Sequence, residues 1–246
     1  MSTVLVIAGT DSSGGAGLTR DVATLSAFGV EALCAVTAVT AQTEREVVAV
    51  TPMPAALVCA QIETALASAR VRAVKTGMLA RADIVEALAA TLPPRARLPL
   101  VLDPVLAATS GGALLDEAGR AALRAHLLPR ATLLTPNIPE AALLLDTAPA
   151  SSAAEIVAQG RALCALGAAA VLMKGGHAAG ALAIDWLVSG DGTVSELTGA
   201  RLAGVRRGTG CALASGIAAG LARGLTLEAA CARAKEHVTA LLQSAA

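Results

Sequence analysis

A Gly-Thr-Gly-Cys segment at residues 208–211 directly precedes a stretch rich in Ala and Gly that has the composition of a helix. Two glycines at a helix start leave backbone N–H groups without partners, and the helix dipole adds positive potential there. Gly208, Thr209 and Gly210 could therefore form an anion hole for a phosphoryl group in transfer. Cys211 would lie at the same N-terminus, where thiol pKa values tend to fall, so it could accept a proton from an alcohol. A buried structural cysteine is the alternative, and the flanking glycines favour the functional interpretation.

A second glycine-rich segment, AGTDSSGGAG at residues 8–17, would let the backbone approach a ligand closely. It matches neither of two common phosphate-binding motifs. Gly15 stands where a P-loop needs Lys, and the strand that should end in an acidic residue in a dinucleotide-binding fold ends in Ala41-Gln42-Thr43. A tight strand-to-helix turn without a ligand is the alternative interpretation of this segment.

Four separated polar residues complete the set that could do chemistry: Asp103, Asn137, Glu140 and Lys174. Carboxylates such as Asp103 and Glu140 could hold Mg²⁺ directly or through water. Lys174, which precedes two glycines, could contact nucleotide phosphates. Each is an ordinary loop residue when taken alone. Together with the anion hole, they supply the metal site, the cation and the oriented amides that phosphoryl transfer requires.

Short β-branched runs alternate with Ala-rich stretches between these residues, and this alternation predicts the elements that position them. The expected strands are 4–8, 32–39, 71–75, 98–102, 132–135 and 169–173, with an antiparallel pair at 182–188 and 193–197. The expected helices are 19–28, 54–69, 81–90, 117–127, 139–145, 153–166, 210–223 and 227–244. The pattern predicts an α/β fold with a mainly parallel sheet that is covered on both faces and binds ligands at the carboxyl ends of its strands. No linker or repeat divides the chain, so residues 1–246 are expected to form one domain.

Composition excludes several other classes of protein. The 19 basic and 19 acidic residues give no net charge, and no basic stripe supports binding to nucleic acid or to an anionic membrane. One Trp, one Phe and no Tyr leave no aromatic platform for stacking bases. Mean hydropathy is +0.65, yet Pro52 and Pro54 interrupt the most apolar window. The N-terminus lacks the basic region of a signal peptide, and five scattered cysteines without a CxxC motif predict reduced thiols in the cytoplasm and no zinc site.

Several motifs in order along the chain resemble the hydroxymethylpyrimidine kinase branch of the ribokinase-like superfamily. They are AGTDSSGGAG at 8–17, AVTAQT at 38–43, VKTGML at 74–79, DPV at 103–105, SGGALL at 110–115, LLPRATLLTPNIPEA at 127–141, LMKGGH at 172–177 and GTGCALASGIAAGLARG at 208–224. The branch carries Cys at the end of the anion-hole motif, where the wider superfamily has Asp. The resemblance spans the chain and implies a ribokinase-like three-layer αβα sandwich that uses ATP and Mg²⁺ and forms a homodimer.

The resemblance also implies residue roles. Gly9, Gln42, Met78 and Val105 match the family's pyrimidine pocket, and Asp21 matches a position near the acceptor alcohol. Asp103, Asn137 and Glu140 match the Mg²⁺ and phosphate neighbourhood, and Lys174 matches the lysine beside the nucleotide phosphates. Gly208, Thr209 and Gly210 match the anion hole, and Cys211 matches the catalytic base.

Such a kinase phosphorylates a small pyrimidine alcohol and then its monophosphate at one site. This sequence departs from the family pattern at Thr43, often Asn, at Leu106, often Met, and at Arg206-Arg207, often Thr-His. The arginine pair is interpreted as a solvated loop rather than as a phosphate contact. Thr43 leaves a pyridoxal kinase of the same superfamily as the nearest alternative, and a non-catalytic ligand-binding regulator on this fold is the alternative from another class.

Overall fold

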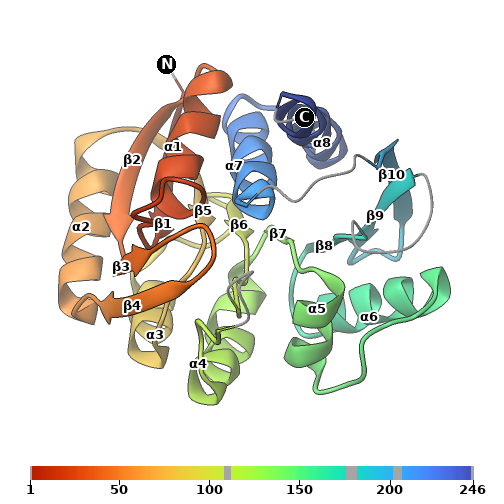
Figure 1. Ribbon diagram of the computed structural model, residues 1–246, viewed down its shortest axis with the longest axis horizontal. Helices are drawn as coiled ribbons and strands as arrows, with labels where there is room; N and C mark the ends of the chain where they lie inside the picture. Colours follow the sequence, from red (N-terminus) through yellow and green to blue (C-terminus); the bar gives the residue numbers. More distant parts are fainter. Residues whose placement is uncertain (1, 108–111, 176–181, 202–206, 245–246) are drawn as a thin grey trace.

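The computed structural model describes residues 2–107, 112–175, 182–201 and 207–244. Its main sheet has eight strands in the order β10-β9-β8-β7-β6-β5-β1-β2 (Figure 1). The strands are β1 Thr3–Ala8, β2 Glu31–Val36, β5 Val71–Thr76, β6 Leu100–Leu102, β7 Leu133–Leu134, β8 Ala170–Met173, β9 Leu182–Ser189 and β10 Val194–Ala200. From β2 through β1, β5, β6 and β7 to β8, neighbouring strands pair in parallel. Strand β9 is antiparallel to both of its neighbours, β8 and β10. The predicted mainly parallel sheet with an antiparallel pair at one end is confirmed.

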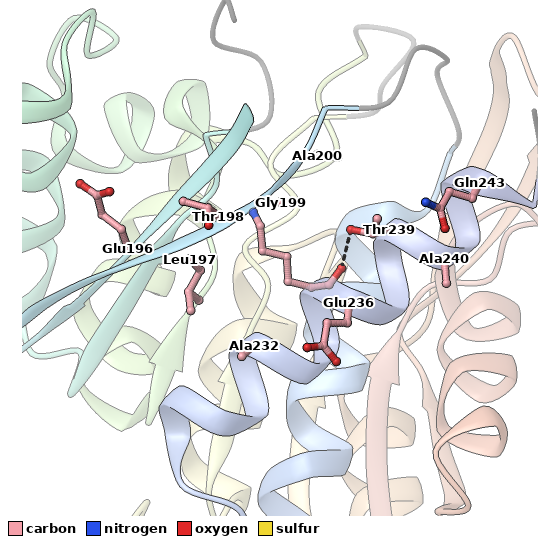
Figure 2. A pocket seen from close by; sticks show the side chains of 11 residues that line it. Glu196, Leu197, Thr198, Gly199, Ala200, Ala232, Glu236, Thr239, Ala240 and Gln243 are labelled. Carbon is pink, nitrogen blue, oxygen red and sulfur yellow. Dashed lines mark hydrogen bonds between the residues drawn. The ribbon is translucent and has the colours of Figure 1, made fainter. Parts of the chain in front are cut away.

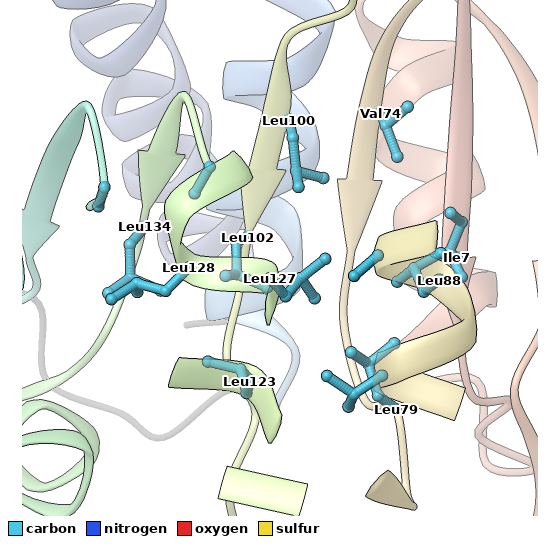
Figure 3. Packing of buried hydrophobic residues seen from close by; sticks show 14 of the residues in the cluster. Ile7, Val74, Leu79, Leu88, Leu100, Leu102, Leu123, Leu127, Leu128 and Leu134 are labelled. Carbon is cyan, nitrogen blue, oxygen red and sulfur yellow. The ribbon is translucent and has the colours of Figure 1, made fainter. Parts of the chain in front are cut away.

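Two layers of helices cover this sheet. The helices are α1 Gly17–Ala27, α2 Ala55–Ser68, α3 Ala82–Thr91, α4 Glu117–Ala122, α5 Ile138–Leu145, α6 Ala153–Ala165, α7 Thr209–Ala222 and α8 Leu227–Gln243. Side chains alternate along the strands, so Leu5 and Ile7 of β1 pack with α2 and α3, whereas Val4 and Val6 pack with α1 and α7. Figure 3 shows the first of these two cores, where Ile7, Leu88 and Leu102 belong to one cluster. The expected three-layer sandwich is confirmed.

One expected strand is two strands in the structure. The prediction of a single strand at 32–39 was wrong, because β2 ends at Val36 and a hairpin of β3 Ala38–Gln42 and β4 Val47–Pro52 forms a separate sheet. Buried Thr37 marks the break: its N–H donates to the carbonyl of Ala8 at 3.0 Å, and its hydroxyl donates to the carbonyl of Met78 at 2.6 Å. These bonds turn the chain away from the main sheet, so the hairpin projects beyond its edge (Figure 1).

The expected helix at 117–127 is also subdivided. Helix α4 ends at Ala122 and continues as a π-helical turn at Leu123–Leu127 and a 3₁₀ turn at Leu128–Arg130. Pro129 lies in that last turn, where its missing N–H and the clash of its ring with the preceding turn prevent continuation of the α-helix.

Helix α7 is almost entirely buried, which explains its composition of Ala and Gly. A Cβ atom added at Gly220 would come within 2.7 Å of the Cβ of Ala230 in α8, and one at Gly216 within 3.2 Å of Phe28 after α1. Small residues therefore let α7 pack closely between its neighbours and hold its N-terminus at the carboxyl edge of the sheet. Among the described residues, no helix has the length and apolar character needed to cross a membrane.

Candidate active site

The N-terminus of α7 has the geometry that its Gly-Thr-Gly-Cys sequence predicts. Gly208 precedes the helix with φ +77° and ψ 10°, a left-handed conformation that favours glycine. A Cβ at this position would lie 2.1 Å from the carbonyl oxygen of Gly15, so the 8–17 loop and the helix end are in tight contact. No side chain of the described residues caps α7, so the backbone N–H groups of its first turn have no side-chain partner.

Lys174 lies next to this helix end, at the carboxyl end of β8. Its Nζ is 3.2 Å from Asp103 Oδ1 and 3.7 Å from Glu140 Oε2. A Cβ at Gly210 would be 3.5 Å from the Nζ and 3.9 Å from Asp103 Oδ2, which places the anion hole beside the pair. Burial alone would lower the pKa of Lys174, but Asp103 and Glu140 raise it above its ordinary value. Lys174 is therefore a permanent cation at the anion hole.

Asn137 and Glu140 have a structural task that the sequence analysis did not assign. They form a capping box at the start of α5: the Glu140 N–H donates to Asn137 Oδ1 and the Asn137 N–H donates to Glu140 Oε2, both at 2.8 Å. Burial raises the pKa of Glu140, and Lys174 opposes this shift. The motif fixes both residues at the site, with one Glu140 oxygen already used by the cap.

The expectation of a lowered pKa at Cys211 was wrong. Burial raises the pKa of its thiol to about 11, while Lys75 lowers it and both Asp21 and Asp103 raise it. A backbone N–H at Gly17 also lowers it. A helix N-terminus stabilises a thiolate, but here desolvation outweighs the dipole. Cys211 is therefore a thiol at neutral pH and a strong base once ionised.

Asp21 lies behind the site rather than on its surface. Its side chain has 0% exposure, Lys75 Nζ lies 2.8 Å from each of its carboxylate oxygens, and the Ser215 hydroxyl donates to Oδ1 at 2.8 Å. All these bonds join α1, β5 and α7. The predicted place of Asp21 near the acceptor alcohol stays a prediction, and in this structure the carboxylate has no surface with which to contact a ligand.

Two predicted pocket residues, Gly9 and Met78, lie in contact with each other. A Cβ at Gly9 would lie 3.2 Å from the Sδ of Met78 and 3.4 Å from the carbonyl oxygen of Ala38, so only glycine fits there without displacing a neighbour. Val105 has φ +39°, which is strained for a β-branched residue. Strain of this kind persists where the surroundings impose it, and it is concentrated at functional sites.

Gln42 belongs to the β3–β4 hairpin, which is fastened to the 8–17 loop. The Ser12 hydroxyl donates to the carbonyl of Gln42 at 2.9 Å and accepts from its N–H at 2.8 Å. Thr40 makes two similar bonds with Thr10. These bonds therefore fix the main chain of Gln42 relative to the glycine-rich loop.

The interpretation of Arg207 as a solvated loop residue was wrong. Its guanidinium donates to Asp11 Oδ2 at 3.2 Å, to the Ser13 hydroxyl at 3.2 Å and to the carbonyl of Thr43 at 2.6 Å. Arg207 therefore joins the start of α7, the 8–17 loop and the hairpin. Arg206, Gly176, His177, Ser110 and Gly111 lie outside the described residues.

A pocket of about 390 Å³ lies between β10 and α8 (Figure 2). Leu197, Thr198 and Gly199 line one side, and Glu236 and Thr239 line the other. It contains none of the predicted site residues.

A chain of polar contacts connects this pocket with the cation at the anion hole. Lys235, which lines the pocket, donates to Asp185 Oδ2 at 2.6 Å, and Asp185 Oδ1 accepts the N–H of Gly175 at 2.9 Å. Gly175 directly follows Lys174. The contacts therefore place the pocket on the Lys174 side of the site.

Sequence reasoning gave no role to Lys75 and Asp11. Both carried a signal: Lys75 interrupts an otherwise apolar strand segment, and Asp11 lies inside the glycine-rich loop. A charge inside a buried strand must be paired, and such a pair marks a functional-site candidate.

Comparisons with known proteins find similar proteins over almost the whole length of this chain. The family model described as phosphomethylpyrimidine kinase matches residues 11–246. A hydroxymethylpyrimidine/phosphomethylpyrimidine kinase of Rhizobium meliloti is 44% identical over 98% of this chain and 90% of its own length. A Clostridium difficile phosphomethylpyrimidine kinase structure has a TM-score of 0.85 at 34% identity over 98% of this chain and 99% of that one. An ADP complex of Bacillus subtilis pyridoxal kinase has a TM-score of 0.89 at 32% identity over 98% of this chain and 91% of that one.

Proposed function

The chain belongs to the phosphomethylpyrimidine kinase family, and we propose that it transfers the γ-phosphoryl group of ATP to 4-amino-5-hydroxymethyl-2-methylpyrimidine and then to the resulting monophosphate, in thiamine biosynthesis. One observation carries the proposal: the uncapped N-terminus of α7 lies beside Lys174 and Asp103, with Cys211 in its first turn. This arrangement supplies amides, a cation and a base around one point, which is what phosphoryl transfer to an alcohol needs.

The first transfer needs a base. The hydroxymethyl O–H bond breaks, its proton passes to the Cys211 thiolate, and the oxygen bonds to the γ-phosphorus as the bond to ADP breaks. The amides of Gly208, Thr209 and Gly210 stabilise the charge that develops on the transferred group. Lys174 neutralises the phosphates of the nucleotide.

The second transfer has a phosphate as its acceptor, which is already ionised at neutral pH. It therefore depends on charge neutralisation more than on a base. Lys174 and the α7 amides carry this step, and Cys211 contributes little to it.

Mg²⁺ fits the donor set near Lys174. Asp103 and Glu140 offer carboxylate oxygens, the hard ligands that Mg²⁺ prefers, and the described residues contain no cluster of three or more metal-binding side chains that would hold an ion alone. We infer that Asp103 and Glu140 would hold Mg²⁺ together with the nucleotide phosphates, and that the ion would supply charge neutralisation.

The pocket between β10 and α8 is our candidate for the nucleoside end of ATP. It exceeds 300 Å³, a size typical of small-molecule pockets, and its Lys235 is connected to the Lys174 loop through Asp185. The variant Ala240→Trp, which fills the pocket from its exposed rim, should raise KM for ATP while leaving KM for the acceptor unchanged. Equal changes in both constants would contradict this placement.

Pyridoxal phosphorylation is the second candidate, because the TM-score to a pyridoxal kinase is 0.89. In either case Gly9, Met78 and Gln42 would bind a flat ring, and the Gln42 amide can both donate to a ring nitrogen and accept from an exocyclic amine. That pairing favours the aminopyrimidine. The proposal also includes action in the cytoplasm and assembly as a homodimer, which follow from the family resemblance.

The test is ATP consumption with Mg²⁺ and three acceptors: the hydroxymethylpyrimidine, its monophosphate and pyridoxal, with products identified by mass. We expect the pyrimidine to gain two phosphates in succession. If pyridoxal alone is phosphorylated, the assignment of the phosphate site stands and the assignment of Gln42 is overturned. ATP binding without transfer to any of the three would indicate a non-catalytic regulator.

A further inference from the structure

Lys75 is a buried cation that the mechanism above does not use. It lies in β5 with no exposed side-chain surface, and its Nζ is 2.8 Å from both carboxylate oxygens of Asp21, which is equally buried. Removing two charges from water is costly, and apolar residues of similar size often replace such a pair without loss of stability. A buried pair beside a reaction centre therefore calls for a role beyond packing.

The pair lies against the same helix turns that carry Cys211. Gly17 and Asp21 are four residues apart on α1, and Cys211 and Ser215 are four residues apart on α7, so each pair shares one helix face. The Gly17 N–H is directed at the Cys211 thiol, and the Ser215 hydroxyl donates to Asp21 Oδ1 at 2.8 Å. Lys75 reaches Asp21 from β5, and Asp21 bonds Ser215, which lies one helical turn along α7 from Cys211.

Charged groups face Cys211 from three elements packed against it. Lys75 approaches from β5, Asp21 from α1, and Asp103 from the end of β6. Lys174, after β8, also interacts electrostatically with Cys211, which raises the pKa of Lys174. Burial is the main cause that raises the pKa of Cys211, and Lys75 is the strongest group acting against it. The ammonium of the ion pair acts on the thiol more strongly than the carboxylate does.

We propose that Lys75 is a positioning residue for the first phosphoryl transfer: its buried ammonium, fixed by Asp21 and Ser215, holds α7 against α1 and supplies the positive charge that stabilises the Cys211 thiolate. In this step the acceptor O–H bond breaks and an S–H bond forms at Cys211. The acceptor oxygen bonds to the γ-phosphorus as the bond to ADP breaks, so the negative charge of the thiolate ends on the phosphorylated product. Lys75 neither gains nor loses a proton and does not touch the substrate.

The test compares two variants of the same ion pair. Asp21→Asn removes the carboxylate and keeps Lys75, whose ammonium the Asp103 carboxylate still stabilises, whereas the double variant Lys75→Met with Asp21→Asn removes both charges. The readout is the rate at which iodoacetamide alkylates Cys211 at pH 8.5, followed by peptide mass. Well below its pKa, a thiol reacts in proportion to its thiolate fraction, so a shift of one pKa unit changes the rate about tenfold.

An electrostatic role predicts opposite signs. Compared with the wild-type protein, Asp21→Asn should be alkylated faster at Cys211 and the double variant should be alkylated more slowly. The rates of the two variants should differ about tenfold. A purely structural role would move both variants in the same direction, because both break the same ion pair. That result, or an unchanged rate in the double variant, would overturn the proposal.

Turnover supplies the second readout, which rests on the proposed function. The double variant should lose about tenfold in kcat/KM for the hydroxymethylpyrimidine while retaining turnover of the monophosphate, whose ionised acceptor needs no base. Retained monophosphate turnover also shows that the variant is folded. Parallel loss of both activities in a folded variant would contradict the proposal. If the wild-type protein phosphorylates neither acceptor, the proposed function fails, while the alkylation rates still decide the relation between Lys75 and Cys211.

Discussion

Replacing Cys211 by Ala separates the two phosphoryl transfers. The thiol pKa of about 11 means that about one molecule in ten thousand carries a thiolate at pH 7. This fraction rises tenfold for each pH unit, so kcat/KM for the hydroxymethylpyrimidine should rise with a slope near one between pH 7 and pH 9.5. A positioned general base contributes about 10²- to 10⁴-fold, and we expect Cys211→Ala to lose a factor in this range and to lose the slope.

The same variant should change the second transfer by only a few fold, since the acceptor phosphate is already ionised. The assay measures ADP release with each acceptor over the pH range, with products identified by mass. Cys164→Ala is a matched control, because Cys164 is a partly buried cysteine of α6 in the opposite helix layer. It should leave both profiles unchanged.

Two outcomes would refute the reasoning. A wild-type profile that is flat from pH 7 to pH 9.5 would mean that thiolate formation at Cys211 does not limit the first transfer. An equal loss in both transfers would mean that Cys211 shapes the anion hole rather than accepting a proton.

Three further substitutions test the geometry around α7. Gly208→Ala forces a left-handed residue against the carbonyl oxygen of Gly15, so it should cost about 2 kcal/mol or more in urea denaturation and abolish both transfers; a stable, active variant would contradict the tight contact. Arg207→Ala should raise KM for the acceptor about tenfold with little change in kcat, because loss of a charge-assisted contact costs about 1.5–3 kcal/mol and this residue anchors the hairpin that carries Gln42. Arg207→Lys should recover part of that affinity, and an unchanged KM in Arg207→Ala would show that the hairpin is held without it. Lys174→Met should reduce both transfers about 100-fold at unchanged far-UV circular dichroism, and a loss confined to one transfer would contradict a shared phosphate site.

Periodicity and turn residues were sufficient for most of the fold. Continuous apolar runs such as Val4–Ala8 predict a strand buried on both faces, and β1 is buried along its whole length. One exception is the segment after β2, where no local signal separates Val36 from Ala38. The break there depends on Thr37, whose partners Ala8 and Met78 are distant in sequence.

Some features of the candidate site follow from local sequence, and others depend on contacts between distant segments. Local sequence determined that a helix with a glycine start follows residue 208, that polar residues end the strands, and that the family resemblance spans the chain. Local sequence could not determine the charge state of Cys211, because the helix dipole is a local effect whereas burial and the charges of Lys75, Asp21 and Asp103 depend on three other elements.

Arg207 shows the same limit. Its neighbours in the chain gave no reason to prefer a bound state over a solvated one, and its partners Asp11 and Thr43 lie more than 160 residues away. The sequence by itself determined which chemical groups this protein has and the order in which they reach the sheet edge. Only the tertiary structure decided which of them are paired, buried or exposed, because desolvation and charge pairing depend on distances between elements that the chain brings together when it folds.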